Sequence, residues 1–328
     1  MIYRQLGKTG INVSAISLGT WQVGGKWGEH FSHSLADRIL NEAIDSGINF
    51  IDTADVYSDG ESEKAVGRIV KARSEKIFVA TKCGRQLNPH ISASYQPTVL
   101  RQFVEDSLQR TGLETLDLIQ LHCPPTDVFY RPEIFELFDR LKSEGKIQNL
   151  GVSVERVEEA LKGIEYENVT TVQIIFNLFR QRPAELFFSE AKKKNVGIIV
   201  RVPLASGLLT GKFTNTSTFN SGDHRSFNRN GEAFDKGETF SGIDYNKGLE
   251  AVEELKSIFP NNENLAPLAL KWILGFDEVS TIIPGASTKE QVASNLSALS
   301  IPSLTAFQIE AMQAVYEKYI KKEVHQLW

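Results

Sequence analysis

Hydrophobic and polar positions along the chain follow two alternating periodicities. Short apolar runs rich in β-branched residues, typical of buried strands, are separated by longer stretches in which apolar residues recur at helical spacing. Strands that alternate with helices favour a parallel sheet covered on both faces, and therefore an α/β fold. The predicted strands are residues 13–19, 49–54, 77–82, 116–122, 147–153, 171–177, 197–204 and 280–286.

The stretches between these strands carry the apolar stripes of amphipathic helices. Residues 35–44, 100–108 and 135–141 each place apolar side chains three or four positions apart, and Gly145 follows the third stripe. Eight strand–helix units within 328 residues fit a (β/α)8 TIM barrel, which takes roughly 250 residues plus insertions. We therefore expect one barrel domain over residues 1–328.

Two segments depart from this alternation. Residues 205–245, rich in Gly, Ser, Thr and Asn, form a long polar insertion after the seventh predicted strand. Loops that follow barrel strands carry function, so this insertion is expected to be a lid or clamp over the C-terminal face. Residues 305–319 predict an extra C-terminal helix that opens at Thr305.

Composition and charge narrow the function classes. A net charge of -5 and a pI near 5.8 lack the basic footprint of nucleic-acid binding. No apolar run approaches the roughly 20 residues of a membrane span, and the start lacks a signal-peptide layout, so a cytoplasmic location is expected. Cys83 and Cys123 are expected to be free, buried thiols that face the helix layer, and no metal site is expected.

Four polar residues end strand-like runs or follow them closely: Asp52, Tyr57, Lys82 and His122. Each alone also fits a cap, a packed loop or a solvated position. In a barrel, however, these strand ends converge, and a partly buried carboxylate and ammonium must pair. The ammonium favours the ionised form of a nearby phenol, and an imidazole can orient a substrate oxygen. The set predicts proton transfer to or from a carbonyl or alcohol.

The chain resembles the aldo-keto reductase superfamily, in its bacterial branches, along nearly its whole length. The resemblance rests on several blocks in the same order, among them LGKTGINVSAISLGTW, GINFIDTADVYSDGESEKAVGR, LDLIQLHCP, VPLASGLLTGK and TIIPGASTKEQVASNL. It implies that Tyr57 donates a proton during reduction or accepts one during oxidation. It further implies that Lys82, held by Asp52, lowers the pKa of this tyrosine, while His122 orients the substrate oxygen.

The resemblance also implies a nicotinamide cofactor. The resemblance favours NADP. NAD is the alternative, because the positions near the start of the last barrel helix that are often basic in the family are Gly285, Thr288 and Gln291 here, and Lys289 is the basic residue left to bind a 2'-phosphate. No GxGxxG fingerprint follows a strand, so a Rossmann site is not indicated. The implied cofactor contacts are Gly19, Thr20, Trp21, Asp52, Ser153, Gln173, Arg201, Pro203, Leu204, Ser206, Gly207, Leu209, Gly211, Lys212, Gly285, Ser287, Thr288, Lys289, Gln291 and Asn295.

Two positions depart from the family pattern. Val154 stands where an asparagine is usual, which predicts the loss of one carboxamide contact. Arg201 stands where many relatives place an aromatic side chain on the nicotinamide. A guanidinium plane can stack as well, with a fixed positive charge beside the ring, or it can swing away to pair with an acid. Both alternatives are left open for Arg201.

The expected substrate contacts are Trp21, Trp27, Tyr57 and His122. Aromatic walls of this kind suit a small carbonyl compound or a sugar, with an aldose as the oxidative example. Tyr95, Phe129 and Trp328 are further candidates for the pocket rim. A second function class is a cofactor-sensing binding module that resembles the β subunits of potassium channels. A third, a barrel hydrolase using Asp52, lacks a second carboxylate. A homo-oligomer is left open.

Overall fold

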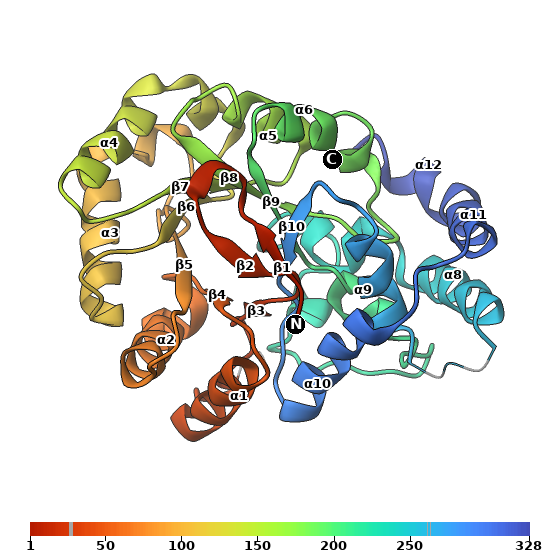
Figure 1. The fold of residues 1–328 in the computed structure, drawn as a ribbon. Helices are drawn as coiled ribbons and strands as arrows, with labels where there is room; N and C mark the ends of the chain where they lie inside the picture. The colour runs from red at the N-terminus through yellow and green to blue at the C-terminus, as the bar shows by residue number, and fades with distance from the viewer. Residues whose placement is uncertain (26–28, 261, 263) are drawn as a thin grey trace.

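Eight parallel strands form the centre of the protein in a computed structural model that describes residues 1–25, 29–260, 262 and 264–328. They are hydrogen-bonded in sequence order, and bridges from Ile16 to Ile282 and from Gly19 to Gly285 bring the first and last strands together. The predicted (β/α)8 TIM barrel is confirmed (Figure 1). Its strands are β3 (Leu18–Gly19), β4 (Phe50–Asp52), β5 (Phe78–Cys83), β6 (Leu118–His122), β7 (Leu150–Ser153), β8 (Val169–Ile175), β9 (Gly197–Arg201) and β10 (Val279–Ile282).

Helices surround the barrel and cover the outer face of its sheet (Figure 1). The predicted stripe at 35–44 is the buried face of the first helix, whose N-cap Ser32 accepts a hydrogen bond from the Leu35 N–H. The longer helices are α1 (His33–Asp45), α2 (Glu61–Ala72), α3 (Pro97–Thr111), α4 (Pro132–Ser143), α5 (Val157–Gly163), α6 (Phe187–Lys193), α8 (Tyr245–Ile258), α9 (Ala266–Leu274), α10 (Lys289–Ser297) and α11 (Ala306–Val315).

A short N-terminal hairpin covers the end of the barrel where the strands begin. It consists of β1 (Tyr3–Gln5) and β2 (Asn12–Ser14), which pair antiparallel. The prediction of one strand over 13–19 is therefore wrong. Its apolar run spans β2 of the hairpin and β3 of the barrel, and periodicity alone does not reveal the bend between them.

The barrel interior is layered from this closed end toward the other. Leu6 and Val13 belong to one buried apolar cluster with Phe50, Phe78 and Leu118 from the strands. Because side chains alternate along a strand, the next inward positions are Asp52 and Gln120, each two residues further along, and Lys82, which is four residues after Phe78 and two after Ala80 of the same cluster. Along the barrel axis, the apolar layer is therefore followed by a polar layer at the C-terminal ends of the strands.

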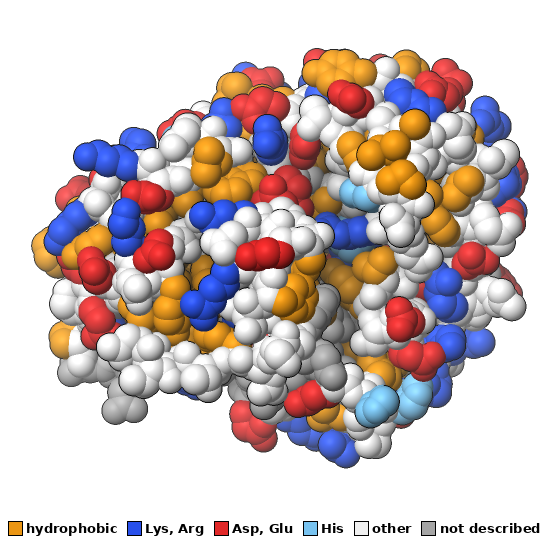
Figure 2. Space-filling model, turned by 180° about the vertical axis from the view of Figure 1, so that it is seen from behind, with side chains coloured by type: hydrophobic (Ala, Val, Ile, Leu, Met, Phe, Trp, Pro, Cys, Tyr) orange, Lys and Arg blue, Asp and Glu red, His pale blue; other side chains and the backbone are white. Residues whose placement is uncertain are grey.

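The polar insertion after β9 folds into short helical turns, among them α7 (His224–Phe227) and the turns Lys236–Glu238 and Phe240–Gly242. The predicted C-terminal helix begins at Thr305, which caps it, and continues through a π-helical turn into α12 (Lys321–Val324). On the side away from the view of Figure 1, the surface is hollowed, and basic and histidine side chains lie in the hollow (Figure 2).

Candidate active site

A buried ion pair forms the centre of the polar layer. Lys82 Nζ donates to Asp52 Oδ1 at 2.5 Å and to the Thr53 carbonyl oxygen at 2.7 Å. Both charged side chains are almost completely buried. Burial lowers the pKa of Lys82, but the charges of Asp52 and Tyr57 outweigh it and the net shift is upward. The lysine is therefore a fixed cation beneath the mouth of the barrel.

Two amide side chains hold the second oxygen of this carboxylate. Gln120 Nε2 and Gln173 Nε2 donate to Asp52 Oδ2 at 3.0 and 2.8 Å, and Gln173 Nε2 also donates to Gln120 Oε1 at 3.1 Å. Both hydrogens of the Gln173 amide are thereby used. Only its oxygen is left to accept a hydrogen bond from a ligand. Gln120 was not predicted, although its place two residues before His122 on β6 puts it on the same inward face.

Tyr57 lies above the ion pair, just after β4. Ser58, Asp59 and Gly60 follow it with φ values of 49°, 51° and 84°, a left-handed turn that ends where α2 begins. Lys82 Nζ lies 3.3 Å from the Tyr57 hydroxyl. Burial raises the pKa of Tyr57, while Lys82 opposes this rise as an adjacent ammonium should. The hydroxyl therefore keeps its proton until a reaction draws it away.

His122 faces the same phenol from the end of β6. Its ring lies edge-on to Tyr57, with 6.1 Å between the ring centroids. Burial, aided by the charges of Arg85 and Lys82, holds the pKa of His122 well below its usual range. The imidazole is therefore neutral near pH 7. Its Nδ1 is buried and has no hydrogen-bond partner among the described residues, as expected of an atom that awaits a ligand.

An aromatic wall stands beside the phenol. Trp21 stacks on Tyr57, with 5.9 Å between centroids and 13° between planes. Two residues of the insertion reach the same indole: His224 at 5.2 Å and Phe234 at 6.4 Å between centroids. The insertion therefore lies over the candidate site, in agreement with the expected lid or clamp. The polar character of 205–245 hid these two contacts from sequence reasoning.

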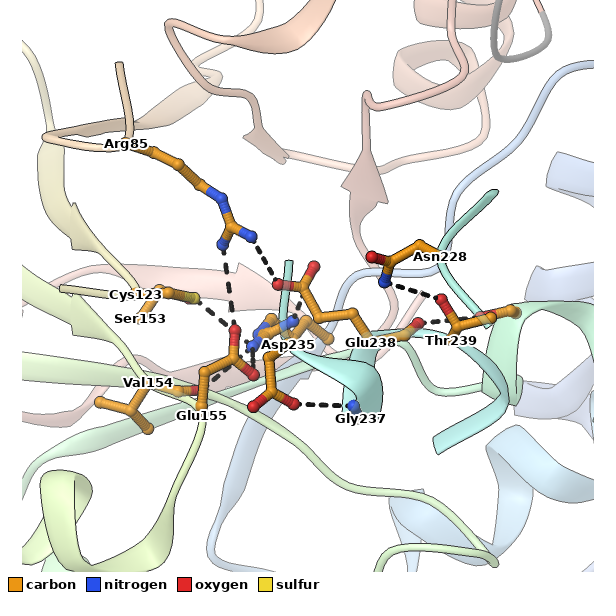
Figure 3. Close-up of polar contacts among 12 residues, drawn as sticks. Arg85, Cys123, Ser153, Val154, Glu155, Asn228, Asp235, Gly237, Glu238 and Thr239 are labelled. Carbon is orange, nitrogen blue, oxygen red and sulfur yellow. Dashed lines mark hydrogen bonds and ion pairs between the residues drawn. The ribbon is translucent and has the colours of Figure 1, made fainter. Parts of the chain in front are cut away.

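A second group of charged side chains lies at the barrel mouth (Figure 3). Arg201 Nη2 donates to Glu155 Oε2 at 2.8 Å and to the Val154 carbonyl at 3.1 Å, and its Nη1 lies 3.6 Å from Glu238 Oε2. Arg85 donates to Glu238 Oε1 at 2.9 Å. The alternative that Arg201 pairs with acids is therefore the one present in the structure. Its stacking on a nicotinamide stays a prediction.

The two carboxyl groups of this cluster differ in charge. Burial raises the pKa of Glu155 to about 8; Arg201 opposes this rise and Glu238 adds to it. Burial would also raise the pKa of Glu238, but Arg85 and Arg201 outweigh it and lower the value to about 2. Near pH 7 the pair therefore holds one proton, on Glu155.

Cys123 belongs to this cluster and not to the helix layer. Its Sγ lies 3.5 Å from Ser153 Oγ and 3.5 Å from Arg201 Nη2. The expectation that this thiol faces the helices is wrong, because β6 ends at His122 and Cys123 has a φ of 46°, which breaks the alternation of the strand. Both cysteines are free and buried, as predicted.

The predicted substrate contacts and rim residues have different outcomes. Trp21, Tyr57 and His122 lie together, whereas Trp27 falls outside the described residues. Phe129 is wrong as a rim residue, because it is fully buried in the hydrophobic core and packs against Phe135 of α4. Trp328 is buried against the Arg180 guanidinium, 4.0 Å from its ring centroid, and contacts Gly237 of the insertion.

The predicted cofactor residues lie on several strand ends around the mouth. Ser153 pairs in register with Gln173 on one side and His122 on the other. The 203–212 segment forms a tight turn in which Ser206 Oγ donates to the Glu238 carbonyl. At the last barrel helix, Thr288 caps α10, and Lys289 Nζ lies 3.0 Å from Glu42 Oε2 of α1. His122, Ser153 and Gln173 occupy paired positions on β6, β7 and β8, and among the described residues the buried His122 Nδ1 has no hydrogen-bond partner. Hydrogen-bonding side chains on three neighbouring strand ends are of the type that a ligand with a carboxamide requires.

Comparison with known proteins identifies the family. The profile of the Aldo/keto reductase family matches residues 15–317. The chain belongs to the aldo/keto reductase family. This aldo/keto reductase is 29% identical over 322 residues to the uncharacterised oxidoreductase YqkF of Bacillus subtilis. The alignment covers 97% of this chain and 98% of the relative. It is 29% identical over 317 residues to the NADH-specific methylglyoxal reductase of Escherichia coli, with coverage of 90% and 93%.

Solved structures of the family have the same barrel. The glycerol dehydrogenase AKR11B4 from Gluconobacter oxydans superimposes with a TM-score of 0.77 at 28% identity, over 97% of this chain and 96% of that one. The holo form of the aldo-keto reductase AKR11C1 from Bacillus halodurans gives 0.76 at 27% identity, over 96% of both chains. This aldo/keto reductase is therefore an oxidoreductase of a family that uses nicotinamide cofactors. No helix in the described part of the chain has the length and apolarity to cross a membrane.

Proposed function

We propose that this aldo/keto reductase interconverts small carbonyl compounds and alcohols with NAD or NADP, and that Tyr57 is its proton donor and acceptor. One observation carries the proposal: Lys82 Nζ contacts both Asp52 and the Tyr57 hydroxyl, and the ring that faces Tyr57 is that of His122, whose buried Nδ1 has no hydrogen-bond partner in the described part of the chain. A bound nicotinamide would supply or take up the hydride. The remaining chemistry falls to the residues around it.

Each residue of the site has a physical role in that chemistry. During reduction, negative charge develops on the carbonyl oxygen, and preorganised donors in a dry site stabilise it. The Tyr57 hydroxyl would give its proton to this oxygen, and Lys82 would stabilise the phenolate that remains. Neutral His122 would donate from one ring nitrogen to the same oxygen. Asp52, held by Gln120 and Gln173, fixes the lysine.

We further propose a small, polar substrate. Trp21, His224 and Phe234 close one side of the space above Tyr57, which favours a compact molecule over an extended one. The names of two relatives, a methylglyoxal reductase and a glycerol dehydrogenase, refer to compounds of three carbons. A short aldehyde, ketone or polyol, or an open-chain aldose, fits this description.

NADP was the first expectation for the cofactor, but one contact favours NAD. Lys289, the basic residue expected to hold a 2'-phosphate, is paired with Glu42 at 3.0 Å. That carboxylate neutralises the lysine and would repel a phosphate dianion, while it could accept a hydrogen bond from a ribose hydroxyl. We propose that NADH binds at least as tightly as NADPH. For its location, we propose the cytoplasm.

A panel of short aldehydes, ketones, polyols and aldoses, run with both cofactors and in both directions, tests this function. Continuous turnover of at least one three-carbon carbonyl is expected, well beyond one cycle per protein molecule. Tight cofactor binding with no more than one turnover on every compound would contradict the proposal. That result would favour the cofactor-sensing module instead.

A further inference from the structure

The carboxyl pair Glu155–Glu238 adjoins the reacting centre without belonging to the Asp52–Lys82 pair. Glu155 comes two residues after Ser153, at the end of β7. The nitrogen of Arg201 that binds Glu155 also lies 3.5 Å from the sulfur of Cys123, the residue directly after His122. Figure 3 shows the pair with Arg85 and Cys123. Glu238 acts electrostatically on Tyr57, and Arg85 and Arg201 act on His122, so the pair lies near the two residues proposed to hold the substrate oxygen.

Ionisation of Glu155 changes the net charge of this region. Near pH 7 three guanidinium groups face two carboxylates, Glu238 and Asp235, because Glu155 holds its proton; one positive charge is uncompensated. When Glu155 ionises, the charges balance. The titratable and charged groups that face Glu155 come from the loop after β5, the end of β6, the segment after β8, the end of β9 and the insertion: Arg85, Cys123, Arg180, Arg201, Asp235 and Glu238.

The other ionisable groups of the site do not change charge between about pH 6 and 9. Lys82 and Tyr57 have raised pKa values, burial raises the pKa of Cys123, and the pKa of His122 is held well below its usual range. Asp55 is the exception, since burial and then Glu63 raise its pKa to about 7. Asp55 comes three residues after Asp52, and the charged groups that act on it are Glu63, Arg110 and Lys82, none of which belongs to the Glu155 cluster.

The oxidised nicotinamide ring carries a positive charge and the reduced ring carries none. A cation next to Arg201 is repelled while Glu155 is protonated and is accepted once Glu155 is ionised. We propose that Glu155 and Glu238 form a proton-linked counter-charge for the oxidised cofactor, so that its binding expels the shared proton to solvent. The reduced cofactor binds without this release. The inference rests on the proposed function. It adds that pH controls the direction in which the enzyme runs.

The linkage has a measurable consequence for each cofactor form. Binding that releases one proton strengthens with pH, by at most about tenfold per pH unit below the pKa of the group that loses the proton. The dissociation constant of the oxidised cofactor is therefore expected to fall by roughly tenfold or more from pH 6 to pH 8 and then level off. The dissociation constant of the reduced cofactor is expected to stay within about twofold. Reduction of the carbonyl substrate is then favoured at neutral pH, and oxidation of the alcohol becomes more favourable at alkaline pH.

Titration calorimetry on the wild-type protein tests this directly. Binding of each cofactor form is measured from pH 6 to 9, and at pH 7 in two buffers of different ionisation enthalpy. The oxidised form is expected to release up to one proton per site, and the reduced form close to none. Both forms binding with the same pH dependence and equal proton release would overturn the inference while leaving the proposed function intact. No binding of either form would overturn both.

Two variants assign the proton. Glu155→Gln keeps the shape of the side chain and fixes its neutral form, so the oxidised cofactor should bind weakly at every pH and release no proton. Asp55→Asn is the control, because Asp55 is the other carboxyl that changes charge in this range. The pH slope should persist in this control. A slope that persists in Glu155→Gln and disappears in Asp55→Asn would contradict the assignment to the carboxyl pair.

Discussion

Lys82 Nζ lies 2.5 Å from Asp52 Oδ1, and neither side chain has appreciable exposure to solvent. A pair of this kind stabilises the fold only while both partners are present, because a single buried charge is costly. The pair therefore links the stability of the barrel to its chemistry. A change at either residue has two effects that must be measured separately.

Lys82→Met should abolish detectable turnover and also destabilise the protein. Breaking a buried ion pair by removing one partner costs about 3–5 kcal/mol of unfolding free energy. Urea denaturation monitored by circular dichroism measures this loss. The double variant Asp52→Asn, Lys82→Met should recover much of the stability, since no buried charge is left alone. It should remain inactive; recovery of activity would show that the lysine does not act on the phenol.

Gln120→Leu should destabilise the protein through Asp52. The substitution removes a hydrogen bond to a buried carboxylate, worth about 1.5–3 kcal/mol. Gln148→Leu is a matched control on the exposed surface and should change the unfolding free energy by about 0.5 kcal/mol or less. Equal stability of the two variants would contradict the support of Asp52 by Gln120.

His122 should make stability depend on pH below about 6.5. Its pKa in the folded state is depressed, so below its unfolded value the unfolded chain takes up a proton that the folded protein refuses. Stability from this residue is therefore lost as the pH falls, by at most about 1.4 kcal/mol per pH unit. Asp55 and Glu155 act in the opposite sense, because their raised pKa values make the folded protein bind protons more tightly.

The comparison of wild type with His122→Asn isolates this contribution. Unfolding free energies at pH 7.5, 6.5 and 5.5 give one difference at each pH. The unfolding free energy of the variant should rise relative to that of wild type as the pH falls from 6.5 to 5.5. A difference that stays constant would mean that His122 takes up a proton in the folded protein as readily as in the unfolded chain.

Glu42→Gln should shift cofactor choice toward NADPH. The change removes the carboxylate that neutralises Lys289, so affinity for NADPH should rise by about threefold to tenfold, since an exposed charge interaction is worth about 1 kcal/mol. Affinity for NADH should fall slightly or stay the same. Asp37→Asn, on the same helix but paired with Arg68, is the control and should leave the ratio unchanged. Fluorescence titration of both reduced cofactors measures it.

Much of the fold could be predicted because strand and helix periods are local properties. The barrel required only the alternation of apolar runs, and Asp52, Lys82 and His122 could be found because each ends such a run. The errors have local causes as well. Nothing in the run 13–19 marks the change from hairpin to barrel, and the positive φ at Cys123 reverses the direction that strand alternation predicts.

The charged cluster could not be predicted, because its members meet only through the tertiary structure. Glu155 and Arg201 follow or end different strands, while Glu238 belongs to a polar insertion whose contacts have no periodic signal. Sequence reasoning left open whether Arg201 stacks or pairs, since its acidic partners were unknown. The same holds for Phe234, whose contact with Trp21 depends on the path of the insertion.

The central claim is that Tyr57 is the proton donor, and Tyr57→Phe tests it most directly. The variant removes one hydroxyl and keeps the ring that stacks on Trp21. Single-turnover reduction of a three-carbon carbonyl is followed at cofactor saturation, and reduced-cofactor affinity is measured by fluorescence. The hydride-transfer rate should fall about 10²–10⁴-fold, with cofactor affinity within about twofold of wild type. A rate equal to that of wild type would contradict the account.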